Sequence, residues 1–211
     1  MRPESRRCFR DRQNYNWQKG FYQLEYCMTF SWTPHRFSGG ALALDVANSV
    51  VLRADPERRI DRFSDPALMD AFATGASRHG AERDLFGPLE PVDADARDGL
   101  ILLREATDRH FRTQILGAGA PNLLADLLDA ISATLRRSGA RPRALDTATA
   151  RSALLLAARP EPERLKICPN CGWLFLDRSR NRSRTWCDMT VCGNRMKASR
   201  HYRRNREELQ S

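Results

Sequence analysis

Apolar residues recur every three or four positions through much of residues 64–159, which is the spacing of an amphipathic helix. Ser64, Asp65 and Pro66 form a good helix start, because a capping side chain precedes a proline in the first turn. Glycines and prolines separate the periodic segments from one another. The pattern therefore predicts a mainly helical region, with helices over residues 66–78, 93–116, 122–137 and 147–159.

The apolar segment before this region fits two structures. In residues 37–52 the alternation of Leu42, Leu44 and Val46 suits a strand, whereas the spacing of Leu42, Val46 and Ser49 suits a helix nearly as well. On a helix, Asp45 and Asn48 would share one face. We expect them to form either a small-ligand pocket or, in our preferred interpretation, a buried polar pair that ties this segment to a neighbouring helix.

The pattern changes after residues 160–163, where two prolines disfavour a helix. Residues 173–176 are an apolar run suited to a strand, residues 178–184 are a polar turn, and residues 185–187 can return as a second strand. The residues after Cys192 tolerate a helix. We predict a small α+β module of treble-clef type over residues 161–211, after a mainly α domain over residues 32–160.

Four cysteines in this module have the spacing of a zinc site: Cys168, Cys171, Cys187 and Cys192 form two pairs separated by 15 residues. Gly172 fits a tight turn in which positive φ is often needed. A redox pair would be expected near a βαβ pattern, and the spacings match no familiar iron–sulfur run. Four cysteines close the coordination sphere, so we predict one structural zinc ion and no catalytic metal.

Four thiolates and one Zn²⁺ sum to a charge of −2, which nearby arginines would offset. Arg195, three residues after Cys192, is well placed for this role, or alternatively for pairing with Asp177 at the end of the first strand. We expect Asn194 to cap or stabilise the start of the last helix.

The stretch CGWLFLDRSRNRSRTWCDMTVCGNRMKASRHYRR resembles the CGNR zinc finger, whose name is spelled by residues 192–195. Asp177 and Trp186 belong to the matching pattern. Thr185 stands where arginine is common in that family, which weakens one possible phosphate contact. The resemblance implies a DNA-binding finger supported by Asp177, Trp186, Asn194 and Arg195.

The region upstream resembles the ABATE domain that precedes this finger in bacterial proteins. The matching residues are Gly39-Gly40, Leu44-Asp45 and Asn48, and Ser49 replaces a usual threonine. Together the two resemblances cover about residues 32–206. They imply a bacterial transcription regulator, stress-linked in its family, whose helical domain is regulatory or ligand-sensing.

The positive charge is concentrated at the C-terminal end. The chain has a formal net charge of +9, and residues 159–206 hold 13 Arg or Lys and 4 Asp or Glu. Codon bias in a GC-rich genome would account for the general preference for arginine over lysine, but not for this placement. We predict a nucleic-acid surface formed by Arg178, Arg180, Arg182, Arg184, Lys197, Arg200, Arg203 and Arg204.

DNA is the preferred partner over RNA, and an RNA- or protein-binding adaptor is the alternative function. A solvated basic tail is the simplest competing interpretation. A small-molecule effector and a homodimer are compatible with the sequence. We expect no enzymatic activity, because we find no nucleophile–base pair, no phosphate-binding glycine loop and no open metal site.

Residues 1–31 differ from the rest of the chain. They mix aromatic, amide and basic residues without a clear period, which predicts a poorly ordered extension, an over-long gene start before Met28, or an aromatic-basic arm for nucleic acid. No apolar run is long enough to span a membrane and no signal peptide is recognisable. We expect a cytoplasmic, nucleoid-associated protein without membrane contact.

Overall fold

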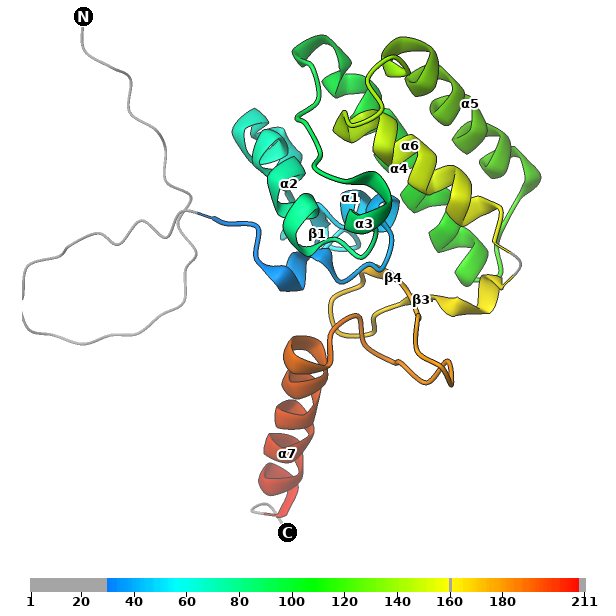
Figure 1. Cartoon of the computed structure of the whole chain (residues 1–211). Helices are drawn as coiled ribbons and strands as arrows, with labels where there is room; N and C mark the ends of the chain where they lie inside the picture. The colour runs from blue at the N-terminus through cyan, green and yellow to red at the C-terminus, as the bar shows by residue number, and fades with distance from the viewer. Residues whose placement is uncertain (1–29, 160, 209–211) are drawn as a thin grey trace, which may run out of the picture. The chain divides into compact units, whose positions relative to one another are not determined.

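The computed structural model describes residues 30–159 and 161–208, and the described residues from Trp32 onward form one unit. Most of this unit is helical (Figure 1). Residues 1–29 of the predicted extension lie outside the described part of the chain. The division predicted at residues 160 and 161 stays a prediction. The helices are α1 (Leu42–Ala47), α2 (Pro66–His79), α3 (Arg83–Phe86), α4 (Arg97–Ile115), α5 (Pro121–Ser138), α6 (Leu145–Ala157) and α7 (Asn194–Glu208).

The four helices predicted from periodicity are confirmed as α2, α4, α5 and α6. Asp65 caps α2 as expected, since its carboxylate accepts a hydrogen bond from the backbone N–H of Ala67 at 2.9 Å. The start predicted at residue 93 is occupied by a short 3₁₀ turn, Ala94–Ala96, and α4 follows directly. The mainly helical fold is therefore encoded locally.

The ambiguous segment at residues 37–52 forms α1, and all six residues of this helix are buried. Because α1 is enclosed on every side, its apolar positions carry no clear helical period. A two-residue antiparallel ladder follows, in which β1 (Val50–Val51) pairs with β2 (Ile60–Asp61). Arg104 of α4 fixes this ladder, because its buried guanidinium donates two hydrogen bonds of 2.7 Å to Asp61.

The hairpin of the C-terminal module forms with different strands from those predicted. Strand β4 (Leu174–Leu176) lies within the predicted first strand, but its antiparallel partner is β3 (Leu165–Ile167), which precedes the first cysteine. Residues 185–187 form no strand, so that prediction is wrong. The reason is that residues 178–184 fold over the carboxylate of Asp177 instead of turning the chain back along β4.

The hairpin shares a hydrophobic core with the helices. Leu165, Leu174 and Leu176 belong to one buried cluster with apolar side chains of α1, α4, α5 and α6. Figure 1 shows β3 and β4 beside α1 and α4, and α7 extending away from them. We refer to residues 32–159 as the helical part. Burial of this apolar area stabilises the contact by about 25 cal/mol per Å² and so fixes the hairpin to the helical part.

Gly40 lies where the helical part approaches β4. Its φ is +79°, and a Cβ atom there would lie 2.9 Å from the carbonyl oxygen of Leu176. Gly117 has nearly the same φ, +72°, but a Cβ atom there would meet nothing within 4 Å. The two glycines therefore separate backbone strain from steric contact.

We predict that Gly117→Ala costs about 1 kcal/mol of stability, the cost of a left-handed alanine. Gly40→Ala should cost at least about 1 kcal/mol more, because a backbone carbonyl cannot move aside cheaply. Chemical denaturation of both variants measures the difference. Equal losses would show that the contact between Gly40 and β4 does not constrain the fold.

Candidate metal centre

The four predicted ligands converge. The Sγ atoms of Cys168, Cys171, Cys187 and Cys192 all lie within 4.8 Å of one another. The sulfur of Cys187 lies 3.6 Å from those of Cys171 and Cys192. A tetrahedral ZnS₄ site with Zn–S bonds of about 2.3 Å has sulfur–sulfur edges of about 3.8 Å. The arrangement fits one zinc ion.

The thiols cannot all ionise at this spacing without a cation. Hydrogen bonds from Cys171 and then Cys187 hold the pKa of the Cys168 thiol far below its ordinary value. The effect on Cys187 is the opposite. Its interactions with Cys168 and Cys171, together with burial, raise the pKa of the Cys187 thiol well above its usual range. A divalent metal ion removes this conflict, because it stabilises all four thiolates together.

The first pair of ligands lies on a tight turn between β3 and β4. Two backbone hydrogen bonds of 2.8 Å close the turn, from Gly172 N–H to the Cys168 carbonyl and from Cys168 N–H to the Trp173 carbonyl. Gly172 has φ +73°, which confirms the predicted need for glycine. Asn170 in the turn donates its amide to the Cys192 sulfur at 3.3 Å, a contact that joins the two halves of the site.

In the second pair of ligands, Cys187 lies just before a π-helical turn, Met189–Gly193, and Cys192 lies within it. Helix α7 follows this turn directly. The cap of this turn is Asp188, whose carboxylate accepts from the backbone N–H groups of Thr190 at 2.8 Å and Val191 at 3.3 Å. The predicted capping residue Asn194 has another contact, since its amide donates to the Thr190 carbonyl. An aspartate just before a turn is a typical cap, so the role of Asp188 has a signal in the local sequence.

Asp177 is fully buried, and its cation is Lys166 of β3 at 2.8 Å rather than Arg195. Burial raises the pKa of its carboxyl, but hydrogen bonds from Lys166 and from Ser179 and Arg184 outweigh burial and lower it strongly. The same ammonium group donates to the carbonyls of Arg182 and Arg184. Asp177 therefore organises the loop between the two ligand pairs.

Two residues from before α1 contact residues adjacent to the metal ligands, and no local sequence pattern indicates them. His35 and Arg36 lie on a 3₁₀ turn, Pro34–Phe37. The His35 ring stacks on Trp173 with centroids 5.3 Å apart, and its Nδ1 lies 2.9 Å from the Asp188 carboxylate.

The Arg36 guanidinium lies 5.8 Å from the centroid of the Trp173 ring. Burial lowers its pKa, and the charge of Arg195 lowers it further, whereas Cys171 opposes the change. Arg195 itself is exposed. Arg36, from the 3₁₀ turn, thus contributes positive charge near the Cys171 sulfur, and the role predicted for Arg195 beside the thiolates stays a prediction. Trp186 is half-buried and packs against the cluster of Cys168, Cys187 and Cys192.

The four predicted arginines of the loop, residues 178–184, differ in their contacts. The loop contains turns, and Arg182 has φ +53°. Arg182 pairs with Glu161 and Glu163, Arg178 lies 3.7 Å from Glu82, and Arg184 donates to the Cys187 carbonyl and covers the Phe175 ring.

Arg180 is exposed, and it has no hydrogen-bond or ion-pair partner among the described residues. Three of the four loop arginines, by contrast, make internal contacts. The loop therefore offers less available positive charge than its sequence suggests.

The predicted basic residues of α7 are on one helix, and all four are exposed. Lys197, Arg200 and Arg204 lie at i, i+3 and i+7, which places them on one face, and Arg203 widens it. The four side chains border the same surface hollow. None of them forms an ion pair with a residue in the described ranges. We refer to these four residues as the α7 basic face.

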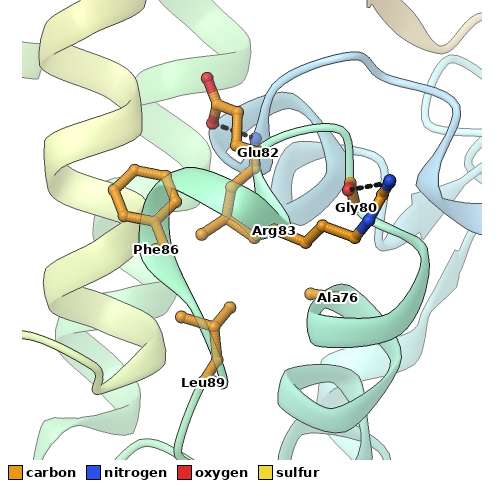
Figure 2. A pocket seen from close by; sticks show the side chains of 7 residues that line it. Ala76, Gly80, Glu82, Arg83, Phe86 and Leu89 are labelled. Carbon is orange, nitrogen blue, oxygen red and sulfur yellow. Dashed lines mark hydrogen bonds between the residues drawn. The ribbon is translucent and has the colours of Figure 1, made fainter.

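Asp45 and Asn48 are both buried and make backbone contacts. Asp45 accepts a hydrogen bond from Gly39 N–H at 2.7 Å, and burial raises the pKa of its carboxyl well above the ordinary value. Asn48 binds the backbone of Leu174 in β4, rather than a neighbouring helix. Neither residue lines the small pocket of about 10 Å³ between α2 and α3 (Figure 2), which is bordered by Leu42, Ala76, Gly80, Glu82, Arg83, Phe86 and Leu89. That volume is about that of one water molecule.

The four converging cysteines define a structural zinc finger. Its elements are the tight turn, the hairpin, the π-helical turn and α7. Residues 164–205 match the family model of the CGNR zinc finger. No curated protein matches the chain, and no solved structure matches it. Among the described residues, no helix combines the length and apolar character that crossing a membrane requires.

Proposed function

We propose that this protein binds nucleic acid, duplex DNA in preference to RNA, through the α7 basic face, and that it regulates transcription. One observation supports this proposal most strongly. The four residues of this face are exposed on one helix and have no acidic partner among the described residues: Lys197, Arg200, Arg203 and Arg204. Cations in this state can release counterions from phosphates without first breaking an internal ion pair.

The distribution of charge supports this proposal. The basic residues concentrate in the finger region, where residues 159–206 hold 13 Arg or Lys and 4 Asp or Glu. The four cysteines fill the coordination of zinc, so the ion maintains the fold and does not act on a substrate. We therefore propose a binding protein rather than an enzyme, located with its DNA in the cytoplasm.

The regulatory part of the proposal rests on the upstream resemblance to the ABATE domain, whose matching residues include Asp45 and Asn48. In this hypothesis the helical part modulates the finger, either alone or in response to an effector. Asn48 supports such communication, because it links α1 to the strand that follows the first ligand pair.

The test is binding of the zinc-loaded full chain to a labelled duplex, measured by fluorescence anisotropy between 50 and 200 mM salt. We expect log affinity to fall linearly with log salt concentration, with a slope of about −0.9 for each phosphate neutralised. Competition with unlabelled duplex and with structured RNA distinguishes the partners. Absence of binding near physiological ionic strength would contradict the proposal, and a preference for RNA would favour the adaptor alternative.

A further inference from the structure

The residues that directly follow Cys171 are held from outside the finger. Within the five residues 172–176, four have a partner in the helical part, either through a hydrogen bond or through ring stacking. The pairs are Arg112 with Gly172, His35 with Trp173, Asn48 with Leu174, and Gly39 with Leu176. The backbone of the first ligand pair is thus continuous with a segment fixed by the helices.

Asn48 makes the most complete of these contacts. Its amide nitrogen donates to the Leu174 carbonyl at 2.8 Å, and its amide oxygen accepts from the Leu174 N–H at 3.0 Å. Asn48 is 4% exposed and Leu174 is fully buried. Removing the Asn48 amide would therefore leave two backbone groups of β4 without partners away from water, which is costly.

Arg112 fixes the turn itself. Its Nη1 donates to the Gly172 carbonyl at 2.9 Å. The other side of the guanidinium is held by Asp108 on the same helix, through hydrogen bonds of 3.0 and 2.7 Å. Because Asp108 orients the guanidinium, the donor that meets Gly172 is positioned by α4 and does not depend on the finger.

We propose that Asn48 and Arg112 are positioning residues of the zinc site, which hold the first ligand pair in its metal-binding geometry from the helical part. They touch no sulfur; they act through residues 172 and 174. The entropy cost of ordering this turn is then offset mainly by the folding of the helical part. Zinc therefore binds to a turn that is already arranged. Linkage requires the reciprocal effect, in which zinc stabilises the helical part.

The first test is zinc affinity of the full chain with Asn48→Ala, measured by competition with a chromogenic chelator at a temperature where the variant is folded by circular dichroism. We expect the zinc Kd to rise about 10-fold, in the range found when residues that support metal ligands are changed. Zinc should also raise Tm by less in the variant than in the natural chain, since linkage ties this rise to affinity.

The matched control is Thr147→Ala. Thr147 is 2% exposed, and its hydroxyl donates to the Ser138 carbonyl at 2.9 Å between α6 and the end of α5. The Thr147→Ala substitution removes a buried side chain–backbone hydrogen bond that does not involve the finger. A merely structural role for Asn48 predicts equal zinc affinity in the two variants, whereas a positioning role predicts weaker zinc binding in Asn48→Ala alone.

A second variant keeps the proposal testable if Asn48→Ala does not fold. Arg112→Gln removes the contact with Gly172 at a more exposed position, and Arg112→Lys retains a donor and should recover most of the affinity. The control is Arg97→Gln, which breaks an ion pair with Asp70 that lies wholly in the helical part. A zinc Kd in Arg112→Gln equal to that of Arg97→Gln would overturn the proposal.

Discussion

Cys187→Ser is expected to lose zinc and to destabilise the helical part along with the finger. The Cys187 sulfur lies 3.6 Å from two of the other ligands, so its loss removes a direct metal bond. Changes to residues that only support metal ligands already cost 10- to 100-fold in affinity, so we expect a loss of at least about 100-fold. Metal analysis after dialysis should show far less than one zinc per chain.

The effect should extend to the helices, because Leu165, Leu174 and Leu176 share their core. We expect the thermal transition of helical ellipticity to fall by about 5 °C or more, which corresponds to roughly 2 kcal/mol for a chain of this size. The control is Cys27→Ser, since Cys27 lies outside the four-cysteine pattern. Full zinc content in Cys187→Ser, or an unchanged transition, would contradict the shared stability of the two parts.

Replacing the α7 basic face with glutamine is expected to abolish most of the salt-dependent binding to duplex DNA. If each of Lys197, Arg200, Arg203 and Arg204 neutralises one phosphate, the slope of log affinity against log salt should become shallower by about 3.6. Glutamine is a good helix former, and the four side chains make no ion pair with the described residues. Zinc content and Tm should therefore not change.

The control for this variant carries the same change in net charge elsewhere. It replaces four exposed arginines of the helical part with glutamine: Arg59, Arg78, Arg109 and Arg136. If binding depends on the α7 basic face, this control retains nearly the full salt slope. An equal reduction in both variants would show that only the total charge matters, and would remove α7 as the binding element.

The helices and the metal ligands were predictable because their determinants are local. A period of 3.6 residues identifies α2, α4, α5 and α6 wherever one face of the helix meets water. The spacing of the cysteines identifies the zinc site, since a two-residue gap lets two thiolates face one ion. The same rule fails for α1, which is buried on all sides and has no polar face to mark the period.

The strand pairing was predicted wrongly because it depends on a choice between partners. The local pattern predicted residues 185–187 as the partner of β4, although β3 offers apolar positions as well. The buried carboxylate of Asp177 decides the outcome, because it gathers Lys166 and the backbone of the following loop around itself. A buried charge must satisfy its hydrogen bonds, and this requirement draws residues 185–187 away from the sheet.

The sequence by itself determined the helical character of the protein, the four cysteines that hold zinc, and the concentration of positive charge in the finger. Only the tertiary structure decided which arginines are available. Among the loop residues, Arg182 pairs with Glu161 and Glu163, and Arg178 lies near Glu82, which is distant in the sequence. The tertiary structure also decided that Asn48 binds the backbone of Leu174 across 126 positions of the chain. Spacing and period encode local geometry, whereas contacts between distant residues depend on how whole elements pack, which no local pattern specifies.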